Sequence, residues 1–264
     1  MDETEIERRW RELLDWYEEN DVTKALVAFS GGKDSTLVLD SALEALEDVK
    51  AVIVDDVIYP EKETTEAKER AEEMGAEHEI LRTDKLSNEN FRANPPDRCY
   101  YCKKELFESI DGDGVILEGT NATEVEGHRP GLKGVEECAR APLLESGITE
   151  DEVREILKWR GRKVWDRPSF ACLASRFPPG RELTEEELKK VERIENRLFD
   201  LGIKQLRIRH FGDTARIEVW PEDMKIVIDN RKKIVRWLKK EGYDKMFLDL
   251  EGYITGSISH EGGR

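Results

Sequence analysis

Cysteine is scarce in this sequence, with 4 residues among 264. A disulfide-stabilised scaffold is therefore excluded, because such scaffolds place many cysteines in a short chain. No run of about 18 apolar residues occurs, so we expect no transmembrane helix. The opening residues, MDETEIERRW, are charged from the second position and do not have the pattern of a secretory signal peptide. These absences predict a cytoplasmic protein without a membrane partner.

Positive charge is also in short supply. The chain has 43 Lys and Arg residues against 59 Asp and Glu residues, which gives a net charge of −16. A surface that binds nucleic acid neutralises phosphates with clustered Lys and Arg, so this balance argues against a nucleic-acid partner. It leaves room for a local basic pocket that binds a small anionic ligand.

The first half of the chain alternates between amphipathic segments and short apolar runs. Apolar residues recur at helical spacing over 3–20, and helical patterns also cover 37–46 and 61–74. Short apolar runs, typical of buried parallel strands, occur at 25–29, 51–54, 79–81 and 114–117. This alternation predicts an α/β fold with a doubly wound parallel sheet.

The pattern changes in the second half. Residues 84–98 and 161–181 interrupt the alternation and are expected to be irregular functional loops. After Gly180, a Thr184–Glu187 capping pattern predicts a helix to about 201, followed by strands at 204–210 and 215–220, a helix to about 240 and a strand over 245–250. We therefore expect a larger α/β domain over 1–180 and a smaller α+β domain over 181–264.

A segment with two glycines directly follows the first predicted strand. Glycines allow backbone N–H groups to surround an anion, and the N-terminus of the next helix adds partial positive charge. The segment lacks the upstream glycine of a Walker A loop and is not a GxGxxG motif. An acidic residue beside phosphates predicts a bridging Mg²⁺ at Asp34. The residues predicted to bind phosphates are Ser30, Gly31, Gly32, Lys33, Asp34 and Ser35.

Three cysteines occupy the two irregular segments. Cys99 and Cys102 form a CxxC, expected in the loop between the third and fourth strands, and Cys172 lies in the later segment. Both segments are expected at the carboxyl edge of the sheet, where open α/β folds bind ligands. Three thiolates suit a [4Fe–4S] cluster, or a zinc ion with Cys138 or His128 as fourth ligand. A structural CxxC is the third alternative, and we expect Cys138 to be structural.

The SGGKDS segment resembles the PP-loop of the N-type ATP pyrophosphatases, which split ATP into AMP and pyrophosphate. The resemblance implies an adenine nucleotide alpha hydrolase-like domain whose second nucleotide-binding wall is formed by Gly119, Thr120 and Asn121. It also implies adenylation, in which an acceptor oxygen attacks the α-phosphate and a nucleophile then displaces AMP. The chain has no room for a glutaminase domain that would supply ammonia, so its cysteines make sulfur the expected nucleophile.

Longer stretches resemble one family, the ATP-dependent sacrificial sulfur transferases of the LarE type. They run in family order over about residues 20–258: SGGKDS (30–35), NPPDRCYYCKKELF (94–107), LEGTN (117–121), HRPG (128–131), RAPLLESGITEDEVREI (140–156), RPSFACLASRFPPG (167–180), LRIRHFGDTARIEV (206–219) and DLEGYITGS (249–257). The resemblance implies an enzyme of nickel-pincer cofactor biosynthesis. Such an enzyme adenylates a carboxylate of pyridinium-3,5-dicarboxylate mononucleotide and replaces AMP with sulfur. A homo-oligomer is also expected, because family members tend to form trimers or hexamers.

The family has two branches that differ in the source of sulfur. In one branch a single cysteine gives up its sulfur and becomes dehydroalanine. In the other, three cysteines bind a [4Fe–4S] cluster that passes on a sulfide. Because this sequence has Cys99 and Cys102 in addition to Cys172, it resembles the cluster branch.

The resemblance also implies roles for residues of the second half. Arg207 and Arg209 alternate on a predicted strand, so both face one side and suit the phosphate of the substrate; the alternative is a pair of surface charges. His210 is expected at the surface. The tryptophans expected in the core are Trp159, Trp165 and Trp220. The predicted catalytic residues are Asp34, Cys172, Ser175, Arg176 and Glu195.

Two other functions remain open on the sequence alone. A tRNA-thiolating PP-loop enzyme, or another PP-loop ATP pyrophosphatase, combines the same loop with cysteines, although the net charge of −16 argues against a tRNA-binding face. A nucleotide-sensing or cluster-carrying module without catalysis is the other alternative.

Overall fold

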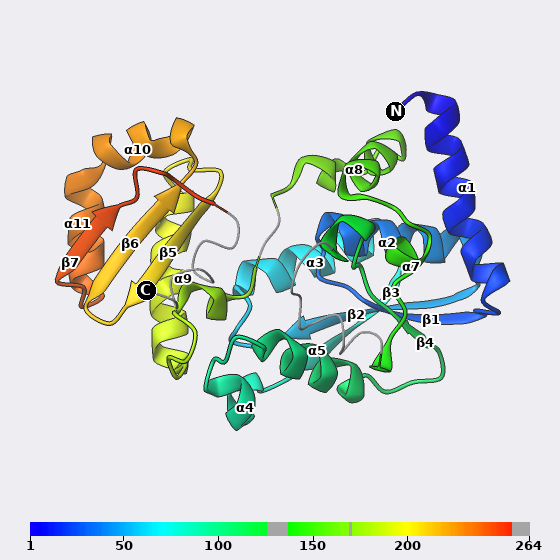
Figure 1. Ribbon diagram of the computed structural model, residues 1–264, viewed down its shortest axis with the longest axis horizontal. Helices are drawn as coiled ribbons and strands as arrows, with labels where there is room; N and C mark the ends of the chain where they lie inside the picture. Colours follow the sequence, from blue (N-terminus) through cyan, green and yellow to red (C-terminus); the bar gives the residue numbers. More distant parts are fainter. Residues whose placement is uncertain (126–136, 169–170, 255–264) are drawn as a thin grey trace. The chain divides into compact units, whose positions relative to one another are not determined.

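The computed structural model describes residues 1–125, 137–168 and 171–254, with the elements labelled in Figure 1. The chain divides into two units, residues 1–84 with 97–170 and residues 85–96 with 171–264. The boundary expected at residue 180 lies within the second unit. There, Gly180 N donates to the Asn94 carbonyl (2.7 Å) and Leu183 N to the Arg92 carbonyl (2.9 Å), which joins its two stretches of chain.

The first unit contains a four-stranded parallel sheet. Its elements are α1 (Glu3–Glu19), β1 (Lys24–Ala28), α2 (Lys33–Ala45), β2 (Asp48–Asp55), α3 (Glu61–Glu73), β3 (Glu77–Arg82), α5 (Arg98–Ser109), β4 (Val115–Leu117), η2 (Ala122–Val125), α7 (Pro142–Glu145), α8 (Glu150–Trp159) and η3 (Lys163–Asp166). The strand order is β3-β2-β1-β4, and every pairing is parallel. The predicted α/β fold with a parallel sheet is confirmed.

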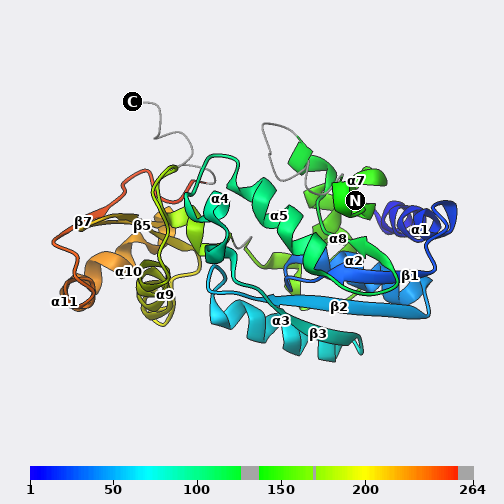
Figure 2. The same ribbon diagram turned by 90° about the horizontal axis from the view of Figure 1, so that it is seen from below.

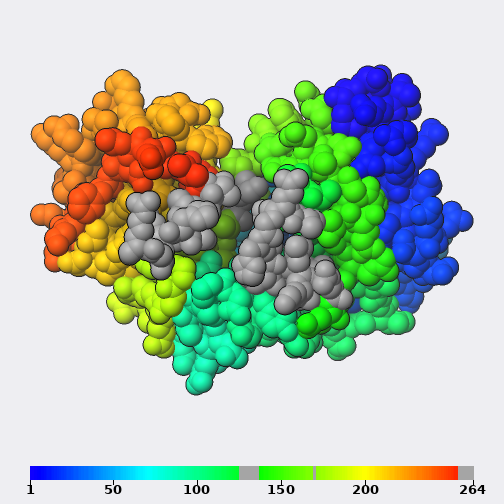
Figure 3. Space-filling view, in the orientation of Figure 1, coloured from blue at the N-terminus to red at the C-terminus, as the bar shows by residue number. Residues whose placement is uncertain are grey.

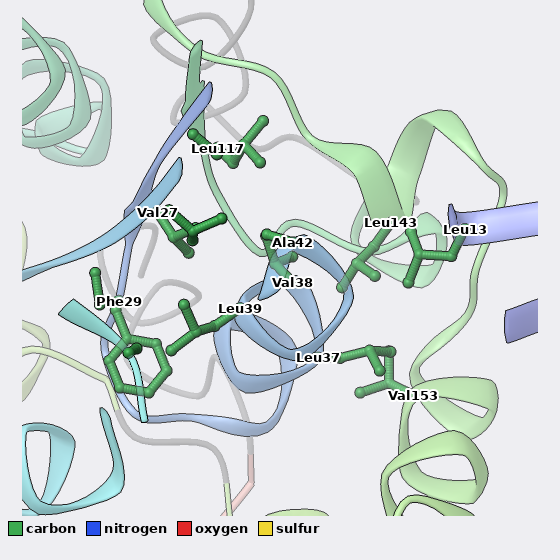
Figure 4. Packing of buried hydrophobic residues seen from close by; sticks show 14 of the residues in the cluster. Leu13, Val27, Phe29, Leu37, Val38, Leu39, Ala42, Leu117, Leu143 and Val153 are labelled. Atoms are coloured by element: carbon green, nitrogen blue, oxygen red, sulfur yellow. The ribbon is translucent and has the colours of Figure 1, made fainter. Parts of the chain in front are cut away.

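Helices cover both faces of this sheet. Successive side chains along each strand point to opposite faces, so the apolar strands place apolar side chains on both faces. Val27 and Phe29 pack on one face in a core that includes residues of α1, α2, α3 and α8, and Figure 4 shows them beside α2. Leu26 packs on the other face with Leu106 and Phe107 of α5. Figures 1 and 2 show α3 and α5 on opposite sides of the sheet. This is the doubly wound arrangement predicted from the sequence.

Local sequence signals set several helix ends. The Asp2 side chain accepts a hydrogen bond from Glu5 N (2.9 Å) at the start of α1, which lies at the surface in Figure 3. Thr149 and Glu152 form a reciprocal capping box at the start of α8.

Across the described ranges, every helix falls short of the apolar length that a bilayer crossing requires.

The second unit contains a three-stranded mixed sheet. Its elements are η1 (Lys85–Ser87), α4 (Glu89–Arg92), η4 (Leu173–Arg176), α9 (Glu185–Phe199), β5 (Leu206–Phe211), β6 (Thr214–Val219), η5 (Pro221–Asp223), α10 (Met224–Asp229), α11 (Arg231–Lys240) and β7 (Lys245–Leu248). The order is β5-β6-β7, with β5 antiparallel and β7 parallel to β6. Thr184 caps α9, where it accepts from Glu187 N (3.3 Å), as its sequence pattern predicts.

The segments expected to be irregular contain more helix than the sequence indicated. Residues 84–98 include η1 and α4, and residues 161–181 include η3 and η4. We expected Cys99 and Cys102 in a loop, but the structure places both on the helix α5. The sequence did not predict this helix for two reasons. Pro95 and Pro96 immediately precede it, and a residue before a proline disfavours helical backbone. In addition, the Asp97 side chain does not cap the helix.

Candidate functional site

The predicted phosphate-binding segment connects β1 to α2. Gly31 has φ +68°, a conformation that favours glycine, and α2 begins just after Gly32. The Ser30 and Ser35 hydroxyl oxygens lie 3.1 Å apart, and Gly32 N donates to Ser30 Oγ (3.3 Å). The loop therefore gathers two hydroxyls and a backbone N–H at the N-terminus of a buried helix, a suitable arrangement for an anion.

The end of β4 meets this loop. Asn121 Nδ2 donates to Asp34 Oδ1 (2.9 Å). A Cβ on Gly119 would lie 2.8 Å from the Ser35 backbone nitrogen, so only glycine allows the two segments to approach this closely. With the order β3-β2-β1-β4, the chain reverses direction across the sheet between β1 and β4. Ligands of open α/β sheets bind at that point, outside the carboxyl ends of the strands.

Asp34 and Lys33 have different surroundings. Burial raises the pKa of Asp34, an effect opposed by Lys33 and by the Asn121 hydrogen bond. Lys33 Nζ lies 3.0 Å from Glu150 Oε1 of α8 and 4.0 Å from Asp34 Oδ2, and its side chain is almost fully buried. A carboxylate next to a phosphate loop fits Mg²⁺, which commonly binds one or two protein carboxylates together with substrate phosphates.

A second network, not identified from the sequence, links β4 to α5. Glu118 is buried and accepts from Thr120 N (2.8 Å) with one oxygen and from Lys103 Nζ (2.8 Å) with the other. Lys103 also donates to Thr120 Oγ1 (3.2 Å). Because Lys103 follows Cys102 directly, this network fixes the cysteine-bearing helix on the predicted nucleotide-binding wall. The sequence signal that could have identified this network was a charged residue, Glu118, directly after the apolar strand β4.

The four cysteines are all described, and none is in a disulfide. Cys99 and Cys102 lie one turn apart on α5, and the Tyr59 hydroxyl lies 3.7 Å from Cys102 Sγ. Cys138 packs against the apolar cluster under α5, which agrees with a structural role. His128, the alternative zinc ligand, lies outside the described residues. Among the residues that the structure describes, no three His, Cys, Asp or Glu side chains are grouped as ligands for one metal ion.

Predicted site residues of the second unit surround the start of η4. Arg176 is fully buried and forms two bonds with Glu195 of α9, from Nε to Oε1 (3.0 Å) and from Nη2 to Oε2 (2.8 Å). Its Nη1 donates to the carbonyls of Ala171 (2.6 Å) and Cys172 (3.1 Å). Arg176 thus holds the two peptide groups that flank Cys172, and Glu195 holds Arg176 in place.

The paired arginines of β5 complete this group. Arg209 bonds Glu218 Oε2 through Nε (2.9 Å) and the Ser175 carbonyl through Nη1 (2.8 Å). Arg207 Nη1 donates to the Leu206 carbonyl (2.7 Å), and burial together with the Arg176 guanidinium lowers the pKa of Arg207 to about 10. Both side chains are buried, so the alternative of two surface charges is wrong. Alternation on β6 was the signal that could have identified Glu218 as their neighbour.

Three other predictions from the sequence are corrected. His210 is not at the surface: it is buried between Tyr243, whose hydroxyl lies 2.7 Å from Nδ1, and Glu187, whose Oε1 lies 3.1 Å from Nε2. Trp159 and Trp165 are each 37% exposed, so they are not core residues. Lys158 Nζ lies 5.3 Å from the centre of the Trp165 ring, so the ammonium group partly covers this exposed indole. Trp220 is half-buried.

Comparison with known proteins decides the family. The profile of a family described as "Queuosine biosynthesis protein QueC" matches residues 24–93, which include the phosphate loop. An uncharacterized protein of Synechocystis sp. is 36% identical over 265 residues, covering 96% of this chain and 98% of the relative. The pyridinium-3,5-bisthiocarboxylic acid mononucleotide synthase of Lactiplantibacillus plantarum is 32% identical over 248 residues, covering 90% of each. The chain belongs to the LarE-type family of PP-loop sulfur transferases.

A further relative is similar over most of its length. An uncharacterized protein of Methanocaldococcus jannaschii is 29% identical over 237 residues, covering 87% of this chain and 90% of the relative. At the level of the LarE-type family, the chain is an ATP-dependent PP-loop sulfur-transferase enzyme. The position of this loop at the reversal point of the sheet is consistent with that use.

Proposed function

We propose that this enzyme activates a carboxylate of pyridinium-3,5-dicarboxylate mononucleotide with ATP and replaces the activated oxygen with sulfur. A carboxylate oxygen attacks the α-phosphorus, the bond from that phosphorus to the bridging oxygen breaks, and pyrophosphate leaves. A sulfur nucleophile then bonds to the acyl carbon, and AMP leaves with the electron pair of the carbon–oxygen bond. Release of the sulfur from its donor gives the thiocarboxylate, and a second round gives the bis-thiocarboxylate.

One observation carries the ATP-dependent part of this proposal: the Asp34–Asn121 hydrogen bond that joins the PP-loop to the segment after β4. It brings two separately predicted nucleotide-binding segments to the edge of the sheet where such ligands bind. The acceptor comes from the name of the Lactiplantibacillus plantarum relative, which is a synthase of the bis-thiocarboxylate.

The residues of the first unit would hold the triphosphate. Backbone N–H groups of the loop and the hydroxyls of Ser30 and Ser35 would donate to phosphate oxygens. Asp34 would hold Mg²⁺ together with those oxygens, and the ion would supply charge neutralisation for the leaving pyrophosphate. Thr120 and Asn121 would line the opposite wall.

The second unit would bind the acceptor. Arg207 and Arg209 would contact its phosphate, a contact for which guanidinium groups of fixed orientation are suited. Arg209 is already oriented by Glu218 and by the Ser175 carbonyl. Ser175, Arg176 and Glu195 would then set the backbone around Cys172.

For the sulfur source, we propose that Cys99, Cys102 and Cys172 ligate a [4Fe–4S] cluster. The donor set fits in type, because thiols outside disulfides are the usual ligands of such clusters, and two of the three lie one helical turn apart. When bound, the cluster would carry the sulfide that is transferred. The alternative donor is the Cys172 thiol itself.

The function is tested by incubating the protein with ATP, Mg²⁺ and the pyridinium mononucleotide. We expect AMP and pyrophosphate in equal amounts, with sulfide supplied, and a product heavier by about 16 Da for each oxygen replaced by sulfur. A parallel reaction with unmodified tRNA should form no AMP. ADP as the nucleotide product, or AMP formation with tRNA alone, would overturn the proposal.

A further inference from the structure

Two arginines that the proposed reaction does not use meet at the PP-loop. Arg70 of α3 donates through Nη1 to the carbonyl oxygen of Gly31. Arg167, which follows η3, donates through Nη1 to the same oxygen (3.2 Å). Two guanidinium groups from distant positions in the sequence therefore hold one backbone oxygen of the loop.

Arg167 is itself held in place. Arg167 Nη2 donates to Glu63 Oε1 (2.7 Å) and to Glu66 Oε2 (2.6 Å), both on α3. Burial and the neighbouring Arg167 lower the pKa of Arg70, as expected for two like charges placed side by side. The carboxylates of Glu63, Glu66 and Glu73 oppose this repulsion.

The bond to the Gly31 carbonyl has a geometric consequence. In a trans peptide, the carbonyl oxygen of one residue and the N–H of the next point in opposite directions. The arginines hold the Gly31 oxygen toward α3, so the Gly32 N–H points to the other side of the loop. On that side the Gly32 N–H meets the hydroxyl of Ser30, which in turn lies 3.1 Å from that of Ser35.

Gly31 itself allows this arrangement. A Cβ at this position would lie 2.8 Å from Ala67 Cα and 2.8 Å from Arg70 Nη1, so the loop and α3 are in direct contact here. The peptide after Gly31 could otherwise rotate, because glycine restricts its own backbone dihedral angles less than any other residue. The arginines remove the freedom that the glycine introduces.

We propose that Arg70 and Arg167 are positioning residues that fix the Gly31–Gly32 peptide so that the Gly32 N–H, with the Ser30 and Ser35 hydroxyls, binds the phosphates of a nucleotide. This inference rests on the proposed ATP site and adds to it two residues that do not contact the nucleotide.

The test measures binding of α,β-methylene-ATP with Mg²⁺ to the full chain. We expect Arg70→Gln and Arg167→Gln each to weaken binding about tenfold, a size typical for loss of a charge-assisted hydrogen bond. Arg167→Lys should weaken it similarly, because an ammonium group cannot contact the carbonyl and both glutamates in the fork geometry of arginine. The control is Arg82→Gln at an exposed position of β3, which should bind like the wild type.

A double variant distinguishes joint action from two separate effects. Because both arginines bind one oxygen, the combined loss should be at least about threefold smaller than the product of the single losses. In protein labelled with ¹⁵N-glycine, the Gly32 amide signal should shift on adding the analogue to the wild type and should shift much less in either variant. The other glycine signals would show that the variants are folded.

The outcomes separate this inference from the proposed function. A wild type that does not bind the analogue would overturn both. A wild type that binds, with variants that bind equally well or an Arg167→Lys variant of full affinity, would overturn only the positioning role. Independent losses in the double variant would also contradict it.

Discussion

At the scale of single residues, polar groups in this protein owe their properties to burial and to fixed partners. Asp34 is the clearest case, since burial raises its pKa while Lys33 and Asn121 act in the opposite direction. A cation that arrives with the nucleotide would stabilise the charged form of this carboxylate, because the cation would replace the interactions with water that burial removes.

Replacing Asp34 by Ala should abolish Mg²⁺-dependent pyrophosphate release, with a loss of about a hundredfold or more. The reason is that the proposed Mg²⁺ bridge to the phosphates loses its protein ligand. Pyrophosphate release is measured under single-turnover conditions, with the exposed Asp48→Ala as control. Normal release in Asp34→Ala would show that the PP-loop role of Asp34 is wrong.

His210 should make stability depend on pH. Burial and the nearby Arg181 lower its pKa to about 4, while Glu187 acts in the other direction. Between that value and the ordinary value near 6.5, the unfolded chain binds a proton that the folded chain does not. The free energy of unfolding should therefore fall as the pH drops through this window, by about 2 kcal/mol from pH 7 to pH 5.

This dependence is measured by urea unfolding at several pH values in the wild type and in His210→Asn. The variant should lose the histidine contribution and have a shallower pH slope below about 6.5. Equal slopes in the two proteins would mean that His210 takes up its proton with the same affinity in both states.

At the scale of elements, the site depends on how closely the end of β4 approaches the start of α2. Gly119 permits that approach, and the Asp34–Asn121 bond fastens it. Lys103 extends the connection to α5 through Glu118. Three elements that are separate in the sequence thus share one polar network at the carboxyl edge of the sheet.

Gly119→Ala should separate these elements, because the added methyl group would lie 2.8 Å from the Ser35 nitrogen. We expect a loss of stability of about 1–3 kcal/mol and a loss of nucleotide binding of tenfold or more, measured by urea unfolding and by titration with α,β-methylene-ATP. Gly114→Ala is the matched control, since its Cβ would lie 3.3 Å from the Lys24 carbonyl oxygen, where a small shift suffices. Equal nucleotide affinity in both variants would argue against the close approach as a requirement.

At the scale of the whole molecule, the proposed chemistry is divided between the two units. The first carries the PP-loop and the CxxC pair, and the second carries Cys172 with a group of buried arginines. Although the chain has a net charge of −16, the side chains of Arg176, Arg207 and Arg209 are all buried within the second unit. In the proposed reaction, these guanidinium groups would hold an anionic substrate that the overall charge would repel.

The fate of the cysteines distinguishes the two sulfur sources. If the cluster is the donor, protein prepared without oxygen should be brown, contain iron, and keep its mass through several turnovers with added sulfide. A loss of about 34 Da at Cys172, the mass of hydrogen sulfide, would instead identify a sacrificed cysteine. Cys172→Ser should still form the adenylate while thiocarboxylate formation stops, and Cys138→Ser is the matched control. A colourless protein with one zinc ion would remove the cluster.

Local sequence patterns were sufficient for the framework of the fold. Short apolar runs predicted the four parallel strands. Apolar residues at helical spacing between these runs predicted the helices that pack on the sheet. Both predictions work because the spacing of buried side chains can be read from consecutive residues. The PP-loop was identifiable for the same reason, since its glycines and its following helix are adjacent in the chain. The alternation of Arg207 and Arg209 likewise followed from a strand.

Other features required the tertiary structure, because they depend on partners far apart in the chain. Burial of His210, the meeting of Arg70 with Arg167 at Gly31, and the Lys103–Glu118 pair all depend on strand order and helix packing. No local pattern specifies which distant side chain will occupy a hydrogen-bond position, since that choice is made only when elements pack. The sequence by itself determined the strands, the loop and the family, whereas packing decided which charged groups hold the loop and which are removed from water.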